Sequence, residues 1–247
     1  MKNLPIIALI TLFCLVAAMC LAQAQTEKPI LIDIGHNPVF YNDPENMNPS
    51  GGQDIERVKY MIGELRKNAK KHDATLDFIT GEITTKMLSS CDLLFIHVPS
   101  AKYTSSEINA IIEYLEKGGA LFVVMDGDYW TTLEKTNIND LMKRFDIKYG
   151  GMSPNQTSGG RTEAGLITSK SLNISYHGSR LIDGGTPFCF NNQGKDYPFG
   201  VFEELDNGGK IVAMGDGMTS LYMTSWDGVD GYQCREFIHE VLGWLLD

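Results

Sequence analysis

One strand–helix–strand unit constrains the fold of this chain more than any other feature of its sequence. Residues 92–98 are apolar nearly throughout, as expected of a strand that is buried on both faces of a sheet. Thr104 and Glu107 then have the spacing of a helix capping box, and Gly118-Gly119 ends the helix before a second apolar run at 120–125. A strand, a helix and a strand in this order form a right-handed parallel crossover. We therefore predict an α/β fold with a mostly parallel sheet.

The rest of the chain adds strands and helices to the same architecture. Hydrophobic periodicity predicts strands at 30–34, 75–79 and 210–214, and helices at 53–71, 133–145 and 231–246. The pattern of 166–202 is one of short strands and turns, and the Gly- and Ser-rich stretch 150–160 is typical of a loop. Neither an internal repeat nor a linker is evident. We expect a single domain over 25–247.

The first 24 residues have the pattern of a secretory signal peptide. Lys2 supplies a positive charge, residues 4–21 are apolar, and Ala22-Gln23-Ala24 places small residues where signal peptidase cleaves. We predict a signal peptide at 1–24, export to the periplasm or the extracellular space, and no membrane span in the mature chain. Two alternatives remain open. The apolar run could stay as a membrane anchor, or Cys20 could be acylated, although Met19 is a poor fit before a lipoprotein cysteine.

Charge and cysteine content exclude several functions. The formal net charge is −10, which disfavours nucleic acid as a partner. The cysteines of the predicted mature chain are Cys91, Cys189 and Cys234, widely spaced and without the Cys/His spacing of a zinc site. We expect no metal and no cofactor. Export would permit one disulfide at most, and the sequence does not say which pair would form it.

Five motifs occur in an order that is typical of a known family. They are Asp33-Ile34-Gly35-His36-Asn37, the unit 92–119, the turn 177–184, the strand and turn 210–217, and the helix 237–245 that ends in Trp-Leu. Together they resemble the amidotransferase-like domain of gliding-motility and intraflagellar-transport proteins, and a related bacterial domain of unknown function that is often exported. The resemblance implies a flavodoxin-like, class I glutamine amidotransferase-like domain with helices on both faces of the sheet. It also loosely implies the binding of carbohydrate or another small ligand.

The chain departs from the enzymes of that superfamily at the catalytic position. Class I amidotransferases carry a nucleophilic cysteine on the turn after the strand that corresponds to 121–125, but here the turn is Asp126-Gly127-Asp128. Cys91 precedes a strand and should lie at the opposite edge of the sheet. Cys189 falls inside a strand-like run, and Cys234 lies in the approach to the last helix. A thiolate nucleophile also needs a neighbouring base. We expect no amidotransferase activity.

Polar residues nevertheless gather where ligands bind in open parallel sheets, at the carboxyl ends of the strands. The candidate ligand-binding residues are Asp33, His36, Asn37, Ser100, Asp126, Asp128, His177 and Asp216. Carboxylate, imidazole and amide groups suit sugar hydroxyls or a hard cation. The alternative is structural: the carboxylates tie down turns, and His97, in a strand, is a satisfied core residue. Tyr129, Trp130, Tyr222 and Trp226 either stack on sugar rings or belong to the core and rim.

Three functions are compatible with these patterns. The first is a non-catalytic module that binds a small polar ligand or a glycan. The second is a structural or protein-interaction domain of an envelope assembly, with unknown partners. The third is a hydrolase that uses an Asp/His cluster, with or without a divalent metal, and with His36 or His177 as the base. An open pocket at the carboxyl ends of the strands would favour the first function, and a filled one would favour the second.

Overall fold

The computed structural model describes residues 27–48, 54–153, 159–194, 196–217 and 231–247. The predicted signal peptide at 1–24, with Cys20, lies outside the described residues, as do Tyr222 and Trp226. Among the described residues, no helix is both long and apolar enough to cross a bilayer.

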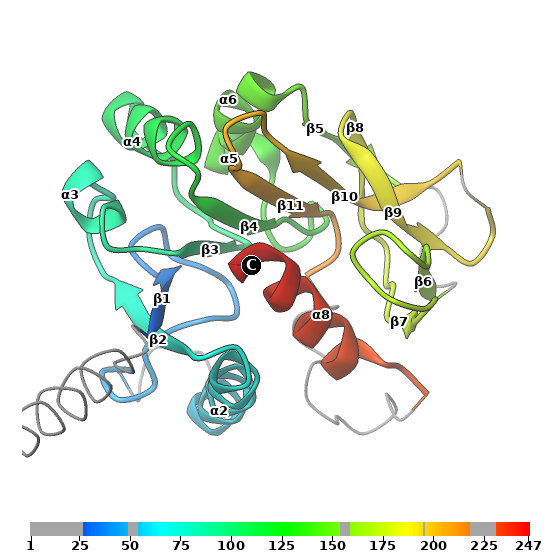
Figure 1. Cartoon of the computed structure of the whole chain (residues 1–247), viewed down its shortest axis with the longest axis horizontal. Helices are drawn as coiled ribbons and strands as arrows, with labels where there is room; N and C mark the ends of the chain where they lie inside the picture. Colours follow the sequence, from blue (N-terminus) through cyan, green and yellow to red (C-terminus); the bar gives the residue numbers. More distant parts are fainter. Residues whose placement is uncertain (1–26, 49–53, 154–158, 195, 218–230) are drawn as a thin grey trace, which may run out of the picture.

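A parallel sheet forms the centre of the molecule (Figure 1). Its described strands run in the order β2 (Ala74–Ile79), β1 (Lys28–Asp33), β3 (Leu93–His97), β4 (Ala120–Val124) and β11 (Lys210–Met214). All five of these strands are predicted by the apolar and β-branched runs, and β3 and β4 keep all of their residues buried. This order, with the second strand outermost, is that of flavodoxin-like folds. The expected α/β class is confirmed.

An antiparallel extension continues the sheet beyond β11. Its described strands are β10 (Pro198–Glu204), β9 (Thr186–Asn191), β6 (Gly160–Thr162) and β7 (Asn173–Ile174). A separate two-stranded sheet pairs β5 (Lys148–Met152) with β8 (Arg180–Asp183). The prediction of a loop over 150–160 is therefore wrong at both ends, because Gly150 to Met152 belong to β5 and Gly160 begins β6.

Helices cover both faces of the parallel strands, as predicted (Figure 1). On one face, α2 (Ile55–Lys70) and α8 (Cys234–Leu246) share a core with the sheet. On the other, α3 (Thr85–Leu88), α4 (Ser105–Leu115) and α6 (Ile138–Met142) share a second core. Successive strand residues alternate between these cores because side chains on a strand point to opposite faces. In β3, for example, Phe95 joins the first core and Leu94 the second.

One predicted helix is broken. Residues 133–145 form α5 (Leu133–Thr136), α6 and a 3₁₀ turn (Lys143–Phe145) in place of one continuous helix. The break is at Asn137, whose backbone is left-handed with φ 44°. The Asn137 side chain accepts a hydrogen bond from the Tyr103 N–H at 2.9 Å and donates one to the Tyr103 carbonyl at 3.1 Å. This tertiary contact, absent from the local pattern, outweighs helix propensity.

The start of α4 confirms the predicted capping box. The Thr104 hydroxyl accepts a hydrogen bond from the Glu107 N–H at 3.2 Å, and the Glu107 carboxylate accepts one from the Thr104 N–H at 2.8 Å. This cap holds Glu107 beside the carboxyl end of β1.

Candidate functional site

Asp33, the last residue of β1, is the centre of a buried cluster at the carboxyl edge of the sheet. Its carboxylate accepts a hydrogen bond from the Gly35 N–H at 3.0 Å and another from the Tyr103 hydroxyl at 2.7 Å. Nδ1 of His36 lies 2.9 Å from Oδ2 of the same carboxylate. Asp33 is 2% exposed. The residue therefore ties the loop after β1 to the segment before α4.

His36 lies between two carboxylates. Its Nδ1 faces Asp33, and its Nε2 lies 3.2 Å from Oε1 of Glu107. The ring also stacks on Tyr103 with 3.9 Å between centroids, which suits a cationic imidazolium. Burial acts to lower the pKa of His36, but the hydrogen bond and charge of Asp33 and the charge of Glu107 raise it above the usual value.

Glu107 completes this cluster from α4. Its carboxylate accepts hydrogen bonds from the N–H groups of Ile83, at 3.0 Å, and Thr104. Burial acts to raise the pKa of Glu107, but these donors, the Thr104 hydroxyl and the charge of His36 lower it below the usual value. With both ring nitrogens of His36 facing carboxylates, the surroundings favour the protonated imidazolium.

A second cluster forms where β4 and β11 end. Asp126 is fully buried and accepts hydrogen bonds from the N–H groups of Gly127, at 2.6 Å, and Gly217, at 3.0 Å, and from the Tyr129 hydroxyl at 3.1 Å. Burial raises the pKa of Asp126 to about 6, although these donors act to lower it. The Asp126 side chain thus joins the turn after β4 to the turn after β11.

Asp216 and Asp128 also hold neighbouring segments. The Asp216 carboxylate accepts a hydrogen bond from the His177 N–H at 2.7 Å, which fastens the turn before β8. Asp128 is paired with Arg180, whose guanidinium is buried and also donates to the Thr131 carbonyl at 2.9 Å. Burial lowers the pKa of the His177 imidazole.

The remaining predicted residues lie between the two clusters. The Ser100 hydroxyl donates a hydrogen bond to the main-chain carbonyl of Asn37 at 2.6 Å, and this bond joins the loops after β1 and β3. His97 is 1% exposed, and burial lowers its pKa to about 3, so its ring is a neutral core group, in line with the structural interpretation. Val98 follows with φ 42°, a strained backbone for a β-branched residue. All eight predicted residues thus lie toward one edge, but as two separate clusters.

The thiols of Cys91, Cys189 and Cys234 are unsuited to nucleophilic chemistry. All three are buried and free. Burial raises the pKa of Cys91 and Cys234 to about 11 and that of Cys189 well above its usual value, so all three are protonated near neutral pH. Cys91 lies at the amino edge of the sheet, as predicted. No group of three or more metal-ligating side chains is present among the described residues.

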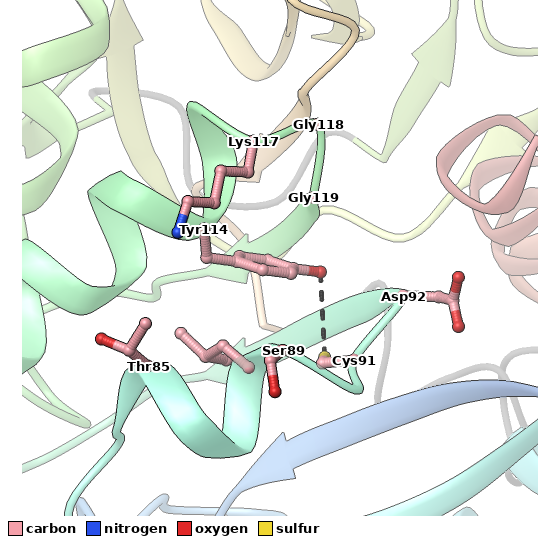
Figure 2. A pocket seen from close by; sticks show the side chains of 9 residues that line it. Thr85, Ser89, Cys91, Asp92, Tyr114, Lys117, Gly118 and Gly119 are labelled. Carbon is pink, nitrogen blue, oxygen red and sulfur yellow. Dashed lines mark hydrogen bonds between the residues drawn. The ribbon is translucent and has the colours of Figure 1, made fainter.

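Open space occurs at that opposite, amino edge. A cavity of about 340 Å³ lies beside the starts of β3 and β4 and is lined by residues that include Cys91, Asp92, Tyr114 and Lys117. Figure 2 shows Tyr114 crossing this cavity with its hydroxyl directed at Cys91. A second cavity of about 200 Å³ shares Asp92 and Gly118 with the first. No motif in the sequence predicts either cavity.

Several residues of the carboxyl edge were also not predicted. Tyr103, Glu107 and Arg180 make hydrogen bonds or ion pairs to the candidate carboxylates, yet none was a candidate. The capping-box spacing signals the position of Glu107 but not its contact with His36. Arg180 carries no signal, because it is 52 residues from Asp128.

Part of this chain is similar to a known domain family. Residues 54–158 match the IFT52 GIFT domain. The GIFT match begins just before α2, spans β2, β3 and β4, and takes in the Glu107 side of the first cluster. No curated protein matches the sequence.

Solved structures extend the likeness beyond the GIFT match. The mmIFT52 N-terminal domain superposes with a TM-score of 0.63 at 20% identity, over 88% of this chain and 97% of that one. A ThuA-like protein from Bacteroides uniformis gives 0.52 at 12% identity, over 88% and 90%. The exo-β-1,4-mannosidase Op5Man5 from Opitutaceae bacterium strain TAV5 gives 0.53 at 10% identity, where 93% of this chain covers only 37% of the mannosidase. At these identities the likeness shows the fold alone.

Proposed function

We propose that this chain is a non-catalytic protein-interaction domain of the GIFT kind. The main support for this proposal comes from three buried carboxylates. Those of Asp33, Asp126 and Asp216 accept hydrogen bonds from the chain's own N–H and O–H groups. Groups used in this way fasten loops and present no open site. The GIFT match over 54–158 supports the same function. The protonated thiols and the clamped His36 argue against an acyl-transfer or hydrolytic role.

The test is site-specific photo-crosslinking in the native host. A benzophenone amino acid replaces one exposed residue at a time on different faces: Tyr129, Tyr60 or Lys86. An interaction domain gives a discrete heavier adduct from one face and not from all three. Adducts from none of the positions, or the same pattern from all of them, would contradict the proposal.

A second candidate is the binding of a small polar ligand or a glycan at the carboxyl edge. The observation in its favour is that Tyr129 and Trp130, just after β4, are 56% and 39% exposed. Exposed aromatic rings stack on sugars, and Phe40 supports Trp130 edge-on at 4.7 Å. Under this alternative a sugar panel raises the melting temperature of the wild type, and Trp130→Ala abolishes the rise. A silent panel leaves the interaction domain as the better account.

We also propose that the domain is exported. The charge at Lys2, the apolar run 4–21 and the small residues at 22–24 support this proposal. Burial of the thiols in the folded domain would protect them in an oxidising compartment. N-terminal sequencing of the protein from an envelope or medium fraction should begin at Gln25. A chain that keeps Met1 or Lys2 in the cytoplasmic fraction would contradict export.

A further inference from the structure

The amino edge of the sheet carries an unused negative charge beside open space. Asp92 lines both cavities, and Figure 2 shows its carboxylate directed away from Cys91 and Tyr114. This carboxylate makes no hydrogen bond or ion pair with any residue that the structure describes; the backbone N–H of Asp92 donates a hydrogen bond to the Pro29 carbonyl at 2.9 Å. Asp92 therefore differs from the carboxylates of the opposite edge, which all have partners.

The cations around the cavities are already paired within the chain. The Lys117 ammonium donates to the Glu113 carboxylate at 2.6 Å. Lys210, which lines the second cavity, donates to the Trp244 carbonyl at 2.9 Å and lies 5.2 Å from the centroid of the Trp244 ring. Neither lysine forms an ion pair with Asp92. The uncompensated charge in the cavities is negative.

The end of α4 adds to the same polarity. Helix α4 ends at Leu115, and Gly118 and Gly119 follow it into the cavity wall. The carboxyl end of a helix carries a partial negative charge that favours a cation within about one turn. The first cavity is also within the range of small-molecule sites and has room for one side chain.

The shape of this wall depends on a residue without a side chain. A Cβ at Gly119 would lie 2.3 Å from atoms of the Tyr114 ring. The Tyr114 hydroxyl accepts a hydrogen bond from the Ala120 N–H at 3.0 Å and donates one to the Ala120 carbonyl at 3.1 Å. The ring is thus fixed and offers a flat apolar surface to the methylene stem of a ligand.

We propose that this cavity binds a basic side chain, lysine or arginine, presented by a partner protein, with Asp92 as its counter-ion. This inference rests on the proposed interaction function and specifies the chemistry of the partner. Charge complementarity selects the occupant: a carboxylate without a partner among the described residues and the carboxyl end of a helix border a slot that an aromatic ring crosses. A small free amine would carry the same positive charge as this side chain, but it would lack the flanking peptide that a partner protein supplies.

The test is an amide-resolved NMR titration of the purified chain with the peptide acetyl-Gly-Arg-Gly-amide. We expect shifts at Asp92, Gly118 and Gly119. The uncharged probe acetyl-Gly-Gln-Gly-amide should leave these amides unmoved, and propylguanidine, which lacks the peptide, should bind more weakly. Asp92→Asn should weaken arginine-peptide binding about 5-fold, near the upper end for an exposed pair. The matched control Asp77→Asn removes an exposed carboxylate elsewhere, on β2, and should bind as the wild type does.

Three results would overturn the proposal: shifts that the glutamine peptide reproduces, equal affinity in Asp92→Asn, or no shift at these amides. Because the Asp92 carboxylate has no partner in the part of the chain that the structure describes, the Asn variant should fold normally, and its melting curve checks this. Crosslinking separates this inference from the proposed function. If an adduct forms from Tyr129 or Tyr60 and its yield is unchanged in Asp92→Asn, the interaction function is supported and the proposed site at Asp92 is contradicted. An adduct from Lys86, next to the cavity, that weakens in Asp92→Asn supports both.

Discussion

The two edges of the same parallel sheet treat their charged groups in opposite ways. At the carboxyl edge, Asp33 and Asp126 are buried, and each accepts several hydrogen bonds from its own chain. At the amino edge, Asp92 has no such partner within the described ranges and borders two cavities. Position at the carboxyl ends of strands is the usual sign of a ligand site in open α/β sheets. In this molecule, the hydrogen-bond partners of a carboxylate indicate better than its position whether it supports the fold or can bind another molecule.

The largest expected difference between the edges comes from removing Asp33. Asp33→Ala leaves the Gly35 N–H and the Tyr103 hydroxyl without their acceptor, and it leaves the His36 imidazolium with one carboxylate in place of two. Breaking a buried charge pair costs about 3–5 kcal/mol. Urea unfolding should show a loss of that order. A loss below about 1 kcal/mol would mean that the cluster does not hold the loops.

Asp126 should make the stability of the fold depend on pH. Its folded pKa of about 6 lies above the usual value of 3.8, so the folded state binds the proton more tightly than the unfolded state. Its contribution to stability is therefore full below pH 4 and is lost as the pH rises through 6, by up to about 3 kcal/mol. Asp126→Asn should remove this decline. Urea midpoints at pH 4 and pH 7 for both proteins provide the measurement, and identical pH dependences would contradict the assignment.

His36 should cause a smaller decline in the free energy of unfolding at higher pH. Because its folded pKa is raised above 6.5, its stabilising contribution is complete below pH 6.5 and is lost as the pH rises through the folded pKa. One group changes the free energy of unfolding by at most about 1.4 kcal/mol per pH unit. His36→Gln, which cannot titrate, should flatten the wild-type decline above pH 6.5. A steeper decline in the variant would point to another titrating group.

Local patterns predict the frame of the molecule well. The strands, α2, α4 and the Thr104 cap follow from apolar period and capping residues that are near one another in the sequence. The direction of parallel strands then predicts that the polar residues after β1, β4 and β11 share one edge. That much of the candidate site required no knowledge of tertiary contacts.

The partners of those residues were not predictable in the same way. Tyr103 reaches Asp33 from 70 residues away, and Arg180 reaches Asp128 from 52. Asn137 breaks a periodic helix because of its contact with Tyr103. The amino-edge cavity depends on how Gly119 meets the Tyr114 ring. Each feature arises from packing between elements, which hydrophobic period does not encode.

The smallest expected effect completes the comparison of the edges. Asp92→Ala removes a carboxylate like that of Asp33, but this carboxylate is exposed and has no partner among the described residues. Surface substitutions of this kind change the free energy of unfolding by no more than about 0.5 kcal/mol. Measured beside Asp33→Ala in the same urea series, it tests whether partners or position decide the role of a carboxylate. A loss in Asp92→Ala comparable to that of Asp33→Ala would mean that Asp92 supports the fold, and the distinction between the edges would disappear.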